Sequence, residues 1–274
     1  MSTRREIKWF IGVALVFLLS ACNAVKFVPQ GQYLLNDVKV KVEDTKEVLG
    51  TDLMKYVQQK QNTEILGFWK LQLGIYNTAS LDTTKWTSKN ARKVGEAPVI
   101  FSPEMADASM TQLARAMNNK GYFRAQVDTS MAMKGRKVNL TYHVTAGEPY
   151  LIGNYKVNFK QTDLYNIAQN DRNVLVRAGE KFDADLLNQE RQRVASAMRS
   201  RGYFYFDAEC IRYEVDSLYK QQRLDVKMCL QPFVEQMTPE EKERLFRQYK
   251  IANVHFHIDY DRSEEHTSEL QSLH

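Results

Sequence analysis

The tripeptide Gly-Tyr-Phe occurs twice in this chain of 274 residues, and its recurrence limits the possible folds more than any other feature. The two copies are Gly121-Tyr122-Phe123 and Gly202-Tyr203-Phe204. Each copy ends a stretch whose apolar spacing predicts a helix, at 108–119 and at 189–199. Each copy is followed by two strand-like runs joined by a turn. A repeat of this kind predicts two copies of one small α+β unit.

At the end of a helix, glycine adopts the left-handed backbone conformation without strain and turns the chain away from the helix axis. We therefore expect this conformation at both glycines, followed by core aromatics that begin a strand. The strands are expected at 123–131 and 137–144 in the first unit, and at 204–215 and 223–230 in the second. Six residues are interpreted as a structural motif rather than as chemistry: Gly121, Tyr122, Phe123, Gly202, Tyr203 and Phe204.

A second repeat marks where the units begin, because Tyr150 and Tyr249 are each followed by Ile and Asn at the same spacing. Alternating residues predict a strand at 34–42, and helical spacing predicts helices at 52–61 and 162–169. The first unit is therefore expected at 34–146, with an irregular but ordered aromatic insertion at 62–102. The second unit is expected at 150–232. A charged helical linker at 233–248 and the first strand of a third unit at 249–261 follow it.

Residues 1–21 have the layout of a secretory signal. Basic residues precede an apolar run at 9–19, which is shorter than the ~20 residues that a membrane-spanning helix needs. The run closes with Leu19-Ser20-Ala21-Cys22, which resembles the lipobox read by lipoprotein signal peptidase. We expect cleavage after Ala21, acylation of Cys22 (by palmitate, for example) and a short tether at 22–33. An ordinary signal peptide or an uncleaved anchor is the alternative.

Charge argues against a nucleic-acid partner, and the two remaining cysteines leave open whether a disulfide forms. The formal net charge is +5, and no run of Lys and Arg suggests a nucleic-acid partner. Cys210 and Cys229 flank an expected turn, and export would permit a disulfide between them. Cross-strand neighbours rarely have disulfide geometry, so two buried free thiols are favoured.

The sequence lacks the motifs of a serine hydrolase, a zinc protease and a phosphate-binding loop. His143 lies in an expected strand, and His255 and His257 share one strand face, where a solvated surface is favoured over a metal site. We therefore expect no enzyme, no catalytic residue, no metal and no cofactor. A cell-wall enzyme that uses the aromatic insertion as a cleft is the least favoured alternative.

The order strand, helix, helix, strand, strand, with Gly-Tyr-Phe ending the second helix, resembles the POTRA (polypeptide-transport-associated) domain. A closer resemblance rests on the segments 26–36 (KFVPQGQYLLN), 74–77 (GIYN), 92–99 (RKVGEAPV), 109–113 (SMTQL), 120–125 (KGYFRA) and 190–193 (ERQR). In their order along the chain they resemble the TamA-like lipoproteins (TamL) of the BamA/TamA superfamily.

This resemblance implies tandem modules, each a three-stranded mixed sheet backed by two helices. It also implies a scaffold in the periplasm, anchored to the outer membrane by lipid and, in full length, by a barrel. The implied partners are a TamB-like periplasmic protein and unfolded outer-membrane protein clients, with no nucleic acid.

An extended client segment would bind by adding a strand to an open sheet edge. The second edge is expected to be the stronger because of its apolar residues, unless a neighbouring unit or the insertion covers both edges. The candidate binding residues are Phe123, Arg124, Gln126, Phe204, Phe206 and Ile211.

The sequence departs from the family near its end. Residues 262–274 look foreign to the rest and are interpreted as an artefactual tail, so the third unit and the barrel are expected to be missing from a truncated fragment. The alternative function is a stand-alone lipoprotein that binds peptides or envelope material without a barrel.

Overall fold

The computed structural model describes residues 24–66, 69–80, 84–169, 173–218 and 222–255. The signal, Cys22, His257 and the tail at 262–274 lie outside these residues. Within them, no helix has both the length and the apolar character needed to cross a membrane. The chain divides into two compact units. The first comprises Met1–Asn154, Arg177–Leu187 and Asp216–Asp225, and the second comprises Tyr155–Val176, Asn188–Val215 and Val226–His274.

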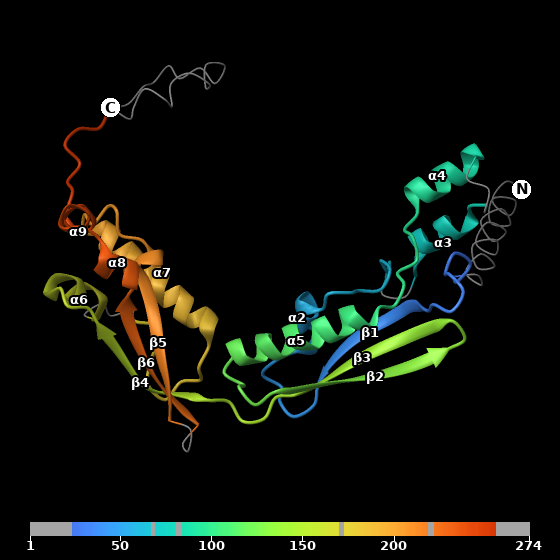
Figure 1. Ribbon diagram of the computed structural model, residues 1–274, viewed down its shortest axis with the longest axis horizontal. Helices are drawn as coiled ribbons and strands as arrows, with labels where there is room; N and C mark the ends of the chain where they lie inside the picture. Colours follow the sequence, from blue (N-terminus) through green and yellow to red (C-terminus); the bar gives the residue numbers. More distant parts are fainter. Residues whose placement is uncertain (1–23, 67–68, 81–83, 170–172, 219–221, 256–274) are drawn as a thin grey trace, which may run out of the picture. The chain divides into compact units, whose positions relative to one another are not determined.

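The first sheet has three strands, β1 (Leu34–Val42), β2 (Gln126–Lys134) and β3 (Lys137–Thr145), in the order β1-β3-β2 (Figure 1). β1 and β3 are parallel, whereas β2 and β3 form an antiparallel hairpin. A parallel pair needs a crossover connection, and the helices between β1 and β2 supply it. The third strand of the unit is therefore central, and the strand after Gly-Tyr-Phe lies at an edge.

The crossover contains α2 (Gly50–Leu53), η2 (Met54–Tyr56), α3 (Leu71–Thr78), α4 (Trp86–Val94) and α5 (Pro103–Asn119). The described parts of the insertion at 62–102 are ordered, as expected. They are not irregular, because they contain α3 and α4. α5 begins five residues before the expected start because Ser102 accepts a hydrogen bond from the N–H of Met105 and Pro103 occupies the first turn.

The core of the first unit lies between β3 and α5. Side chains along β3 alternate between buried and partly exposed, and the buried ones face the helices. The buried residues of this core include Leu140 and Tyr142 of β3 and Leu113 and Met117 of α5. Burying each such side chain contributes roughly 1.5–3 kcal/mol.

The second sheet has the strands β4 (Leu151–Asn158), β5 (Ile211–Leu218) and β6 (Arg223–Leu230) in the order β4-β6-β5, which repeats the order of the first. Between β4 and β5 lie α6 (Thr162–Gln169), α7 (Ala184–Ser200) and the short η3 (Ala208–Cys210). The expected α+β fold, with two three-stranded mixed sheets and the order strand, helix, helix, strand, strand, is confirmed.

Both motif glycines adopt the expected left-handed conformation, with φ of +87° at Gly121 and +95° at Gly202. The tyrosines that follow them are buried, at 1% and 4% exposed. The phenylalanines are not, because Phe123 is 40% exposed and Phe204 is 67% exposed. The expectation that both aromatics of each motif enter the core was therefore wrong for Phe123 and Phe204.

The stretch expected to be a helical linker packs on the second unit. It begins with α8 (Pro232–Gln236) and continues with α9 (Pro239–Phe246), which Thr238 and Glu241 start with a reciprocal capping box. Val234 and Leu245 are buried in the second core, so these helices belong to that core rather than to a linker. Residues 249–255, expected to begin a third-unit strand, form neither helix nor strand.

Candidate functional site

The outer edge of β2 is the most open strand edge in the first unit. Every side chain of β2 except that of Val127 is exposed. Its partner β3 is covered on one face by the helices, whereas Val127 is the β2 residue that packs against the core beneath them. β2 pairs with β3 on one side only, so its other side presents backbone groups without a strand partner in the sheet.

Two methionines give this edge an apolar surface. Met131 lies opposite Leu140 and Met133 lies opposite Val138 in the antiparallel register. Directly opposed residues point to the same face, and both partners on β3 are buried, so the methionines lie on the helix-covered face of the sheet. They are nevertheless 50% and 59% exposed. Flexible methionine side chains suit a surface that accepts varied apolar partners.

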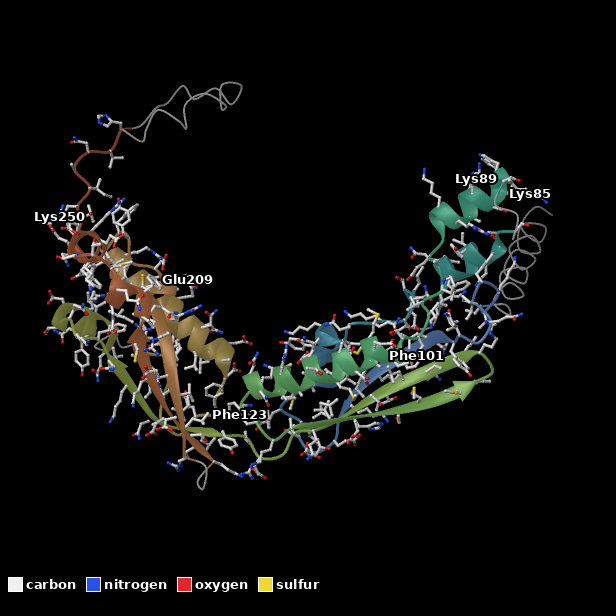
Figure 2. The ribbon with its side chains drawn as sticks, in the orientation of Figure 1. Lys85, Lys89, Phe101, Phe123, Glu209 and Lys250 are labelled. Carbon is white, nitrogen blue, oxygen red and sulfur yellow. The ribbon has the colours of Figure 1, made fainter. Side chains whose placement is uncertain are left out.

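The candidate residues of the first edge lie just before β2 or at its start. Phe123 and Arg124 precede the strand, and Gln126 is its first residue. Phe123 is labelled in Figure 2. Its ring contacts those of Tyr150 and Phe182, with centroids 5.2 and 5.4 Å away. Phe123 therefore joins parts of the first unit, while the open edge lies further along, at Met131 and Met133. The alternation Met-Ala-Met before the Lys-Gly turn was the sequence signal for this edge.

The second edge does not have the apolar character expected of it. Phe206 and Ile211 are fully buried in the second core, and Phe204 lies before the strand. β5 begins only at Ile211, because the Asp207 carboxylate accepts hydrogen bonds from the N–H groups of Glu209 and Cys210 and forms η3. The expectation that Phe206 and Ile211 give this edge an exposed apolar surface was wrong.

Charged side chains also mark β5 as a poor acceptor strand. Arg212 forms an ion pair with Glu214 at 2.7 Å, and its guanidinium donates to the carbonyl oxygen of Leu230 on β6. Charges on an edge strand discourage pairing with another chain. Of the two candidate edges, β2 is therefore the better one.

A serine, a histidine and a carboxylate form a line across the open face of the first sheet. Ser130 Oγ lies 2.8 Å from His143 Nε2, and His143 Nδ1 lies 2.8 Å from Glu43 Oε1. This order resembles a nucleophile, base and acid. The serine and the glutamate are exposed on the sheet face, however, where water competes for both hydrogen bonds. The three side chains therefore link β2, β3 and the residue that follows β1.

A cavity of about 620 Å³ lies between the outer side of β1 and α3. Its carboxylates are already paired, since Asp37 contacts Lys39 at 2.8 Å and Glu64 contacts Lys70 at 3.4 Å. Burial lowers the pKa of Lys70. Carboxylates held in ion pairs are poorly placed to act as general bases. The cavity therefore gives no support to the alternative of a cell-wall enzyme that uses the insertion as its substrate cleft.

Other residues singled out in the sequence are placed as follows. Cys210 and Cys229 are free and buried, as favoured, and burial raises the pKa of the Cys210 thiol to about 11. His255 is exposed. Among the residues with described positions, no cluster of three His, Cys, Asp or Glu could hold a metal ion. The lipobox residues Leu19, Ser20, Ala21 and Cys22 lie outside the described part.

Residues 38–147, which run from β1 through β3, match the family model POTRA, described as a surface antigen variable number repeat. The first sheet of the chain lies within or beside this matched segment, and the second sheet repeats its strand order. A comparison with curated proteins finds no significant match.

Several solved structures align with the chain. POTRA3-5 of Haemophilus influenzae BamA is 14% identical, with 75% of this chain and 69% of that one covered and a TM-score of 0.37. Haemophilus ducreyi BamA lacking POTRA domains 1-3 is 12% identical, with 73% and 29% covered and a TM-score of 0.35. The N-terminal domain of Omp85 from Thermosynechococcus elongatus is 12% identical, with 73% and 63% covered and a TM-score of 0.30. The chain thus spans less than a third of the Haemophilus ducreyi protein.

Proposed function

We propose that the chain is the periplasmic POTRA scaffold region of a factor for outer-membrane protein assembly or translocation. In this proposal it binds extended segments of client or partner proteins by adding them as a strand to β2. The observation that carries the proposal is the exposure of β2 along its length, within the residues that match the POTRA model.

Strand addition suits clients that are themselves unpaired strands. Main-chain hydrogen bonds to an edge demand little of the incoming sequence, which lets one site accept many segments. Met131 and Met133 would then contact every second side chain of the incoming strand, because side chains alternate between faces. The binding energy would come from the backbone, and the methionines would favour segments with one apolar face.

The proposed location follows from the amino terminus. An acylated Cys22 would hold the protein at the outer membrane, facing the periplasm, since more than one acyl chain gives stable anchoring. By resemblance to the TamA-like lipoproteins, a TamB-like periplasmic protein is the proposed partner. Export also agrees with two thiols that are buried away from oxidants and partners.

Binding of a synthetic peptide to the full chain tests this proposal. The peptide has ~10 residues that alternate apolar and polar, as in a strand of an outer-membrane protein. We expect it to perturb the NMR signals of β2 and to bind about tenfold more weakly, or worse, to a Met131→Glu, Met133→Glu variant. Val215→Glu on β5 is the matched control, because Val215 is 44% exposed on the other edge strand.

Equal binding by all three proteins would contradict the proposal, as would perturbation confined to residues outside β2. Both methionines are about half exposed, so the glutamates should leave the fold intact. Circular dichroism of each variant checks this directly.

A further inference from the structure

The beginning of the described chain is fixed to the insertion. The ammonium of Lys26 donates to the carbonyl oxygens of Asn77 and Ala79 at 3.0 and 2.6 Å, at the C-terminal end of α3. Carbonyl groups at that end of a helix lack partners within the helix, so a cation there stabilises it. The ring of Phe27 also meets that of Tyr76 edge-on, with centroids 5.3 Å apart.

This packing brings the anchor point close to the insertion. Only one residue separates Ala24, which packs on the cluster of Val28, Leu34 and Leu73, from Cys22. Two residues of fully extended chain span at most about 7 Å. A lipid on Cys22 would therefore hold this end of the first unit against the bilayer, without a long tether.

One face of α4 is fixed within the unit. Ser88 is 1% exposed, and its Oγ accepts a hydrogen bond from the N–H of Ser80 at 3.0 Å. Arg92 donates to the carbonyl oxygen of Ser80 and lies 5.2 Å from the ring of Phe27. The helix thus has one side packed on the docked amino-terminal segment and the other directed to solvent.

The outer face of α4 is basic and carries an exposed tryptophan. Residues 83–95 contain four cations, Lys85, Lys89, Arg92 and Lys93, and no acidic residue. The three lysines are exposed, and Figure 2 labels two of them, Lys85 and Lys89, on α4. Trp86 is 74% exposed and Val94 is 65% exposed.

We infer that this face of α4 contacts the phosphate-bearing headgroups of an anionic phospholipid surface. Tryptophan concentrates at membrane interfaces, and lysines beside it attract anionic headgroups. A basic amphipathic helix with an exposed tryptophan suits this position, whereas a merely solvated face would not require Trp86. The inference concerns the orientation of the first unit on the membrane, and it deepens the proposed lipid anchoring at Cys22.

The test uses Trp86 as a reporter in the full chain. The chain has three tryptophans, and Trp9 lies in the expected signal, so Trp69→Phe leaves Trp86 alone in the mature protein. The protein is bound to vesicles of phosphatidylethanolamine and phosphatidylglycerol that contain a brominated lipid, or to vesicles of phosphatidylcholine with the same brominated lipid. We expect quenching of Trp86 in the anionic vesicles only, with loss of that quenching at high salt.

Charge reversal provides the matched comparison. Lys85→Glu, Lys89→Glu and Lys93→Glu together should weaken the contact by at least about a hundredfold, since losing each cation near an anionic surface weakens binding about fivefold and the glutamates add repulsion. The same change at the exposed lysines Lys41, Lys46 and Lys60 should leave the quenching unchanged. Equal quenching of Trp86 in both kinds of vesicle, insensitive to reversal on α4, would overturn the inference.

Mass spectrometry of the Cys22 peptide from membranes separates this inference from the lipid anchor. Acylated Cys22 with unquenched Trp86 would leave the anchor standing and reject the contact. Unmodified Cys22 with quenching that depends on the α4 lysines would reject the anchor and keep the contact. Cross-linking of Lys89 to an acidic envelope protein, without quenching by lipid, would also reject the contact.

Discussion

The backbone N–H of Tyr249 donates to the carbonyl oxygen of Gly202 at 2.7 Å, and Tyr150 donates to Gly121 in the same way at 2.9 Å. The phenylalanine of each motif also packs edge-on against the same tyrosine. The ring centroids are 5.2 Å apart for Phe123 and Tyr150 and 6.5 Å apart for Phe204 and Tyr249. The repeat therefore includes the tyrosine as well as the glycine cap. Each cap fixes the chain that follows the hairpin against the end of the preceding helix.

Replacing Gly121 with alanine should destabilise the first unit by more than about 2 kcal/mol. A left-handed conformation alone costs a non-glycine residue roughly 1–2 kcal/mol. A Cβ at Gly121 would also lie 2.5 Å from the backbone oxygen of Phe182, so the chain there must shift. Urea unfolding followed by tryptophan fluorescence measures the effect, since Trp69 and Trp86 both belong to the first unit.

Gly179→Ala is the matched control for this substitution. Gly179 has φ of +89°, close to that of Gly121, but a Cβ there meets nothing within 4 Å. Gly179→Ala should therefore cost only the conformational part, roughly 1–2 kcal/mol. Equal losses for the two variants would mean that the close approach of Phe182 contributes nothing.

Glu190→Gln should destabilise the second unit by about 3–5 kcal/mol, because it leaves Arg193 without its buried counter-charge. The Glu190 side chain is fully buried, and its two oxygens accept hydrogen bonds from Arg193 at 2.8 Å each. It also accepts a hydrogen bond from the N–H of Leu175. Alkylation of Cys210 and Cys229 in increasing urea, read by mass spectrometry, reports unfolding of this unit.

The exposed ion pair between Arg191 and Glu209 supplies the comparison for Glu190. Its atoms are 3.7 Å apart, and the Glu209 side chain is 75% exposed. Glu209→Gln should change stability by less than about 1 kcal/mol. A similarly small effect of Glu190→Gln would show that the buried pair does not stabilise the unit.

Stability of the second unit should fall as the pH rises from about 9 to about 11. Burial raises the pKa of Cys210 to about 11 and also raises the pKa values of Tyr155 and Tyr213. In this range the unfolded chain loses protons that the folded chain keeps, so the folded state is progressively disfavoured. Urea unfolding at several pH values measures the slope, and Cys210→Ala should reduce it. A flat profile would contradict the burial of these groups.

Local sequence patterns were sufficient for much of the fold. β1 at 34–42, α6 at 162–169 and β6 at 223–230 have the expected bounds, because alternation or helical spacing acts within each segment. The start of β5 was missed because Asp207 caps a short helical turn first. The helices α3 and α4 were missed because each is only about two turns long, which is too short for helical spacing to stand out. Leu73 of α3 also packs on Val28 and Leu34, which are distant in sequence.

The candidate site was harder to predict than the fold. The strands after Gly-Tyr-Phe could be expected at sheet edges, but exposure depends on how far the helices reach across each sheet. Phe206 and Ile211 look exposed in a strand pattern and are buried by α7 and its neighbours. Met131 and Met133 are apolar residues that the sequence did not single out, and they are exposed. Tertiary packing overrides the local pattern in both cases.

Hydrogen exchange at the β2 amides, with and without the alternating peptide, tests the central claim most directly. On an edge strand every second N–H points away from the sheet, so the free protein should show alternating slow and fast exchange along Gln126–Lys134. Added peptide should slow the fast set and leave the slow set unchanged. Exchange at β2 that stays the same while the peptide protects amides elsewhere would contradict strand addition at this edge.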